Sequence, residues 1–317
     1  MIAWPEGKRF AFTVFDDTDR ATATNVNEVY ALLRDLGMRT TKSVWPIAGP
    51  RHPTIPGDTC EDDDYRAFTL ELADQGFEIG YHNATYHGVD RAETERALER
   101  FRAIYGHYPR AAANHADNDD ALYWGAARLD GASRLVYRAL QRFRGPRFFG
   151  HVAGDRRFWG DLCQRHIDYF RNFVFEEMDT LEACPYMPYF DPHRPYVTRW
   201  FASAEGATVA DFNTTIREEA QDRLVAQGGA CIMYTHFAKG FQDGSRLDRR
   251  FVELMTRLAR LDGWFVPTSE LLDHIVAHRA TVDGSGVHLL TDDERRDLER
   301  RWLAQRIRSR IRAALVR

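Results

Sequence analysis

The sequence predicts an α/β protein in which parallel strands, joined by helices, form a barrel or a sheet. Two observations lead to this prediction. Apolar runs typical of strands alternate along the chain with amphipathic segments typical of helices, and polar residues stand directly after several of these runs. Strand–helix units in this order give parallel strands with right-handed crossovers. With 317 residues, of which 44% are hydrophobic, the chain can bury a core in one large domain or two small ones.

The first half of the chain contains four predicted strands. The first is the alternating apolar run FAFTVF at residues 10–15, which ends in the adjacent carboxylates Asp16 and Asp17. The others are expected at residues 40–47, 77–81 and 109–113. Apolar residues at helical spacing predict helices at 24–36, 62–75 and 91–105, the first two ended by Gly37 and Gly76. Thr18 or Asp19 is expected to cap a helix.

The second half is regular only after a long middle section. Residues 119–199 show helical patches and a segment rich in Pro and Tyr at 184–196, which indicates a surface or rim loop. The later elements are expected as helices at 211–226, 248–261 and 269–277 and strands at 230–235 and 264–266. The tail at 291–317 has apolar residues at near-helical spacing between many arginines, which predicts an amphipathic helix. Packing on the domain or a second copy is favoured over contact with an anionic membrane.

Charge and cysteine content bound the class of protein. The formal net charge is −4, so the composition gives no reason to expect a nucleic-acid partner. The four cysteines, Cys60, Cys163, Cys184 and Cys231, form no C-x-x-C pair and are too few for a disulfide framework. The first residues are too short and polar for a signal peptide, and no apolar run is long enough to cross a membrane. The expected location is the reducing cytoplasm.

Polar residues that follow predicted strands point to a metal site. Asp16 and Asp17, His82, His115 and His236 each come directly after or close to such a strand. The carboxyl ends of parallel strands meet at one rim, so these residues are expected to converge. A carboxylate with two or three imidazoles suits zinc or another first-row divalent ion, and a second carboxylate and a further histidine can act as base and acid. This set is suited to hydrolysis of an amide or ester.

Several of these segments resemble the polysaccharide deacetylase (NodB-homology) family. The FTVFDD run ending at Asp17 is similar to its T-F-D-D motif, and EIGYHNATYH, residues 78–87, to its H-[ST]-x-x-H motif. The Pro109-Arg110 pair resembles the segment that carries the family's arginine, and CIMYTH, ending at His236, its late L-x-H motif. The resemblance covers roughly residues 10–274 and implies a deformed (β/α) barrel at 1–280, followed by a C-terminal helical extension at 281–317.

The resemblance also implies roles for individual residues. Asp16 would be the general base, and Asp17, His82 and His87 would hold one divalent ion, zinc being the first choice. Arg110 would orient Asp16, and His236 would protonate the leaving amine. The implied substrate is an acyl group, first of all N-acetyl, on a sugar or glycan precursor.

Departures from the family pattern leave alternatives open. His82 and His87 are five residues apart where the family has four, and residues 110–118 lack the family's proline and contain His115, which is an alternative third ligand. A barrel that binds glycans without turnover, or an amidohydrolase for a non-sugar amide, is the alternative function. Trp45 and Trp124 are the favoured candidates for stacking on a sugar, although core packing is the commoner role of tryptophan.

Overall fold

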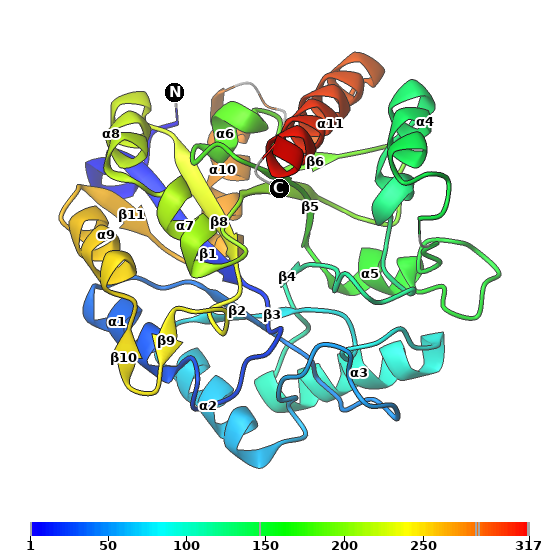
Figure 1. The fold of residues 1–317 in the computed structure, drawn as a ribbon, viewed down its shortest axis with the longest axis horizontal. Coiled ribbons are helices and arrows are strands. Elements are labelled where there is room, and N and C mark those ends of the chain that lie inside the picture. Colours follow the sequence, from blue (N-terminus) through cyan, green and yellow to red (C-terminus); the bar gives the residue numbers. More distant parts are fainter. Residues whose placement is uncertain (1, 146, 283, 285, 316–317) are drawn as a thin grey trace.

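The chain folds into a closed barrel of seven parallel strands with helices around it (Figure 1). The computed structural model describes residues 2–145, 147–282, 284 and 286–315. The ring closes because β8 pairs with both β7 and β1. Its strands, in ring order, are β1 (Phe10–Asp16), β2 (Thr41–Val44), β3 (Glu78–Tyr81), β4 (Ala111–Ala112), β5 (Tyr169–Phe175), β7 (Trp200–Ala204) and β8 (Ala230–Thr235). The predicted barrel fold is therefore confirmed.

Helices connect the strands and cover the outside of the barrel. They are α1 (Asn27–Asp35), α2 (Asp63–Asp74), α3 (Arg91–Tyr105), α4 (Gly131–Leu140), α5 (Gly160–His166), α6 (Thr180–Ala183), α7 (Val209–Thr215), α8 (Glu218–Gln227), α9 (Arg249–Ala259), α10 (Thr268–Val282) and α11 (Asp292–Leu315). Short 3-10 turns occur at η1 (Pro5–Gly7) and η2 (Gly125–Arg128). The other strands are β6 (Tyr189–Phe190), β9 (Gln242–Asp243), β10 (Arg246–Leu247), β11 (Gly263–Phe265) and β12 (His288–Leu289).

The middle of the chain differs most from the sequence prediction. Residues 119–199 supply β5, and β7 begins directly afterwards, so two barrel strands come from a region without a clear sequence pattern. Every residue of both strands is buried, and a strand covered on both faces shows no alternation of apolar and polar residues. The helix predicted at 211–226 is two helices, α7 and α8, because the backbone of Arg217 is extended (ψ 160°) between them.

Alternation along β1 sends neighbouring side chains to opposite faces of the barrel wall. Phe15 points into the barrel, where its ring lies 6.1 Å from the ring of Phe201 on β7. The space around it is tight. A Cβ on Gly80 of β3 would lie 3.2 Å from the Phe15 ring and 3.0 Å from the Ala111 carbonyl oxygen, so a larger residue here would force its neighbours to shift. Asp16, the next residue, points outward toward Tyr30 of α1.

The C-terminal helix packs on the barrel. Trp302 of α11 is buried, with its ring 5.5 Å from Phe173 of β5 and 5.7 Å from Tyr137 of α4. Leu298 and Leu303 are buried beside it, so the first part of the apolar face predicted for 291–317 is covered within the chain, whereas Ile311 further along the helix is 55% exposed. The predicted domain boundary after residue 280 falls in the last turn of α10 and remains a prediction. In the described part of the chain, no helix combines the length and apolar character needed to span a bilayer.

Candidate active site

Four barrel strands deliver polar residues to the same end of the barrel. Asp17 and Asp19 follow β1, His82 follows β3, His115 comes shortly after β4, and His236 follows β8. All five side chains belong to the buried class. The rim expected from the sequence therefore brings together residues more than two hundred positions apart.

Asp19 is the carboxylate that the histidines share. Its Oδ1 lies 3.2 Å from His82 Nε2 and 3.5 Å from His115 Nε2. Its Oδ2 lies 3.2 Å from His236 Nε2 and 3.6 Å from Lys239 Nζ. Burial alone would raise the pKa of Asp19, but the neighbouring His236 and His82 lower that pKa far below its usual value. Asp19 is therefore a carboxylate anion in the middle of basic groups. The prediction that Thr18 or Asp19 caps a helix is wrong, because α1 begins only at Asn27 and its N-cap is Val26.

Asp19, His82 and His115 have the geometry of a divalent-metal site. Their candidate ligand atoms all lie within 4.8 Å of one another. Around a tetrahedral zinc ion at about 2.0–2.2 Å from each ligand, the ligand atoms are roughly 3.3–3.6 Å apart. Among the described residues, Asp19 Oδ1 and His115 Nε2, which lie 3.5 Å apart, are buried without a hydrogen-bond partner, as is His82 Nδ1 on the side of its ring that faces Asp17. Buried polar atoms are rarely left unpaired, so these residues fit a metal ion.

The tautomer of His115 is fixed by its neighbours. Asn118 Nδ2 donates to the Thr85 carbonyl (2.9 Å), which turns Asn118 Oδ1 toward His115 Nδ1 at 2.9 Å. Because Oδ1 can only accept, Nδ1 must carry the proton and Nε2 presents its lone pair toward Asp19. Burial lowers the pKa of His115, and the nearby His82 lowers it further. Neutral imidazole held by a hydrogen bond on its far nitrogen is the usual form of a metal-binding histidine.

His87, the third ligand preferred from the sequence, lies away from Asp19. Its Nδ1 is 3.0 Å from the Gly88 carbonyl, and its Nε2 accepts from the backbone N–H of Arg51 (3.4 Å). Asn83, directly after His82, has a positive φ of 62°, so the chain turns sharply there. Asn83 Oδ1 also accepts the His115 N–H (2.7 Å), which draws the β4 loop toward the site. The structure therefore places the alternative residue, His115, in the cluster.

Asp17 points into the barrel and pairs with Arg171 of β5. Two guanidinium nitrogens donate to its two oxygens, one of them at 2.9 Å, and the side chains are 4% and 3% exposed. His82 Nδ1 lies 3.8 Å from Asp17 Oδ1. Burial would raise the pKa of Asp17, but Arg171 and then His82 reverse this effect and hold the pKa below its usual value. Arg171 was not identified from the sequence, because β5 was not recognised as a strand.

Asp16 belongs to the outer layer of the barrel wall. Its Oδ2 accepts from Lys42 Nζ (2.9 Å) and the Tyr30 hydroxyl (2.8 Å), and its Oδ1 accepts from the Phe237 N–H (2.8 Å). In the described residues, none of its hydrogen bonds or ion pairs involves a histidine. The sequence prediction placed two adjacent carboxylates in one site, but neighbours on a strand face opposite sides. The structure thus brings Asp17 and Asp19 to the histidines, and Asp16 to the helices.

Arg110 lies at the other end of the barrel. It precedes β4, whereas His115 comes after that strand. Its guanidinium pairs with Asp168 (3.0 Å) and with Asp273 (2.9 Å), and its side chain is partly exposed. The structure does not bring Arg110 to Asp16; Arg171 is the arginine that contacts a site carboxylate.

His236 is oriented by a backbone carbonyl. Its Nδ1 donates to the Ala207 oxygen (2.9 Å), so Nε2 faces Asp19 and lies 3.4 Å from the Tyr234 hydroxyl. Nε2 is thus the atom at which His236 can take up or release a proton inside the site.

Trp45, which the sequence suggested for stacking on a sugar, is fully buried. Its ring lies 5.3 Å from the His115 ring, so Trp45 packs against His115.

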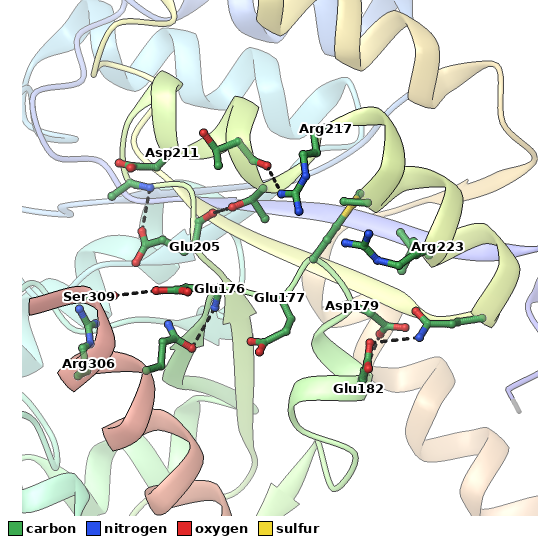
Figure 2. Close-up of a pocket in the computed structure, with 18 of the residues that line it drawn as sticks. Glu176, Glu177, Asp179, Glu182, Glu205, Asp211, Arg217, Arg223, Arg306 and Ser309 are labelled. Carbon is green, nitrogen blue, oxygen red and sulfur yellow. Dashed lines mark hydrogen bonds between the residues drawn. The ribbon is translucent and has the colours of Figure 1, made fainter. Parts of the chain in front are cut away.

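A separate cavity of about 820 Å³ lies between α6, α7, α8 and α11, beside residues 176–179 that follow β5 (Figure 2). Its walls carry acids such as Glu177, Glu205 and Asp211 together with Arg217 and Arg223. Ala207, which holds His236, lines this cavity, but the metal-site residues do not.

Structural comparison agrees with the barrel fold. No protein-family model matches the sequence, and no curated protein matches it. A protein of Mycobacterium smegmatis designated a polysaccharide deacetylase is 13% identical, with a TM-score of 0.51 over 88% of this chain and 94% of the other. A second, from Pseudomonas aeruginosa and designated in the same way, is 9% identical, also with a TM-score of 0.51 and the same two coverages. At these identities the similarity shows the fold.

Proposed function

We propose that the protein is a metal-dependent hydrolase that removes an acyl group, first of all N-acetyl, from a sugar in a glycan or glycan precursor. The observation that carries this proposal is the buried group of Asp19, His82 and His115, whose candidate ligand atoms converge and of which Asp19 Oδ1 and His115 Nε2 have no hydrogen-bond partner among the described residues. The two structures with the same barrel are designated polysaccharide deacetylases, which supports this choice of reaction.

In this proposal Asp19, His82 and His115 hold one divalent ion, with zinc as the first choice for a site of one oxygen and two nitrogen ligands. Three protein ligands leave a coordination position free. When bound, such an ion polarises a carbonyl group and makes water more acidic.

Asp17 and His236 supply the proton transfers. Asp17 is held as a carboxylate by Arg171 and lies beside His82, so it can accept a proton from the attacking water. His236, with Nδ1 held by the Ala207 carbonyl, can give a proton from Nε2 to the departing amine. Water then adds to the carbonyl carbon, the C–N bond breaks, and the products are a carboxylic acid and a free amine.

The test combines metal content with turnover. We expect the purified chain to hold about one divalent ion per molecule and to release acetate from at least one member of a panel of N-acetylated sugars. Asp19→Ala should lose both metal and activity, since it removes the shared carboxylate. His87→Ala is the matched control. It removes a histidine from the loop that also contains His82, but this histidine contacts Arg51 and not Asp19.

Loss of the ion in His87→Ala with retention in Asp19→Ala would overturn this ligand set. Tight binding of glycans without acetate release, under several metals, would favour the glycan-binding alternative. Release of acyl groups only from non-sugar amides would favour the amidohydrolase alternative.

The four cysteines are all free and buried, which is consistent with a reducing cytoplasm as the location that we propose.

A further inference from the structure

Arg128 is a buried arginine without an acidic partner in the described part of the chain. The other buried arginines each pair with carboxylates: Arg171 with Asp17, and Arg194 and Arg295 both with Asp191. Arg128 is 4% exposed. Across the described residues, no carboxylate lies within ion-pair distance of its guanidinium, and its Nε has no hydrogen-bond partner. A buried charge is normally paired, so this exception requires an explanation.

Aromatic rings surround the guanidinium without neutralising it. The Arg128 carbon Cζ lies 3.9 Å from the ring centroid of Trp124 and 5.1 Å from that of Trp302. Such contacts stabilise a cation, but by less than the loss of its hydration costs. Arg306 adds a like charge nearby, and burial, followed by this charge, lowers the pKa of Arg128 to about 9. An anion next to the guanidinium would relieve both effects.

Arg128 lines a pocket that has room for such an anion. The pocket, about 380 Å³, lies between η2, α4 and α11. Helix α4 contacts both of the others, and it lies next to α11 in Figure 1. Its lining includes Trp124, Trp302, Arg128, Arg306 and Arg310. This wall contains three arginines and no aspartate or glutamate. Arg310 donates to the Leu140 carbonyl and Arg306 stacks over Trp302 at 5.2 Å, so neither is neutralised there.

We propose that this pocket binds the phosphate group of a ligand, with Arg128 as its main contact and Arg306 and Arg310 at its wall. One guanidinium would suffice for a carboxylate. Three guanidinium groups without an acid favour a group with more charge and more acceptor oxygens, which phosphate provides. This site is distinct from the metal cluster, and the inference does not depend on the proposed hydrolase activity.

Calorimetric titration of the full chain tests the proposal, with inorganic phosphate, glucose 1-phosphate and glucuronate as separate probes. We expect at least one phosphate probe to bind, and Arg128→Met to weaken that binding by about tenfold to a hundredfold, because charge-assisted hydrogen bonds disappear. Tighter binding of inorganic phosphate than of glucose 1-phosphate would identify a site for the free ion, and the reverse a site for a phosphorylated sugar. Without ligand, Arg128→Met should melt no lower than the native chain, because an uncompensated buried charge is gone.

Two further variants keep the test decisive. Arg306→Gln changes an exposed residue of the pocket wall, so it should fold normally and weaken phosphate binding by about threefold to tenfold. Arg249→Met, on α9 and 93% exposed, removes one positive charge far from the pocket and should leave phosphate affinity unchanged. The proposal is overturned if Arg128→Met binds phosphate as the native chain does, if Arg249→Met weakens binding equally, or if glucuronate binds more tightly than both phosphates.

Discussion

Replacing Lys42 by methionine tests whether Asp16 is a structural residue of the barrel wall. Lys42 and Asp16 form an ion pair of 2.9 Å in which both side chains are completely buried. Lys42→Met keeps the length of the side chain but leaves the Asp16 carboxylate with only the Tyr30 hydroxyl and the Phe237 N–H. Removing one partner of a buried pair destabilises a protein by about 3–5 kcal/mol. For a chain of 317 residues this corresponds to a melting temperature lower by roughly 4–8 °C.

The dependence on pH follows from the pKa of Lys42. Burial alone would lower this pKa, but Asp16 outweighs burial and raises it above 10.5. A group whose pKa is raised on folding stabilises the protein fully below its unfolded pKa, and the effect disappears as the pH rises through the folded pKa. The difference between the native chain and Lys42→Met should therefore be constant from pH 6 to 9 and decrease only above about pH 10.

The double variant Asp16→Asn with Lys42→Met separates structure from catalysis. It removes both charges, so thermal denaturation should show most of the lost stability restored. Metal content should be unchanged, and turnover on the best acylated sugar should stay within about tenfold of the native value. Complete loss of turnover in a stable, metal-loaded double variant would refute this reasoning, because it would return the role of base to Asp16.

Three further predictions concern the site and the C-terminal helix. Asp17→Asn should retain the metal ion and lower kcat by about a hundredfold or more, measured as acetate release, because the carboxylate that accepts a proton is lost; unchanged kcat would exclude Asp17 as the base. His236→Ala should lower kcat similarly for N-acetyl substrates and less for esters with good leaving groups, which need no proton; an equal loss on both would argue against an acid role. Trp302→Ala should cost about 3–5 kcal/mol in denaturant unfolding, whereas Ile311→Ala, 55% exposed, should cost less than about 0.5 kcal/mol; equal effects would contradict the packing of α11.

The sequence predicts the barrel well where strands carry a local signal. Residues 10–16 alternate in size and end in carboxylates, and 230–235 is a short apolar run before a histidine, so β1 and β8 are expected almost at their observed bounds. β5 lacks such a signal, because Arg171 and Asn172 interrupt its apolar run. Both side chains can be buried because they donate hydrogen bonds to residues distant in sequence: Arg171 to Asp17 and Asn172 to Tyr189. A local sequence pattern does not contain these partners.

The candidate site shows the same limit. Strand ends identify His82, His115 and His236, because the position of a residue after a strand is a local property. Which carboxylates join these histidines depends on the side of the barrel wall to which each residue of β1 points, and on the turn that follows the strand. Asp16 points outward, whereas Asp17 and Asp19 reach the histidines. The choice between His87 and His115 depends on Asn83, which links two loops through the His115 N–H. Such a contact becomes evident only in three dimensions.

The outer layer of the barrel also fixes the inner site. Asp17 donates its backbone N–H to the Thr235 carbonyl (2.8 Å), and Asp16 Oδ1 accepts the Phe237 N–H (2.8 Å). These two bonds tie β1 to the residues directly before and after His236. Asp19 is only two residues beyond Asp17, so the distance between Asp19 and His236 is set by a short, doubly anchored piece of backbone. The buried Lys42–Asp16 pair faces away from the histidines. It nevertheless holds Asp16 in place to accept the Phe237 N–H, and so helps to position His236, the proposed acid.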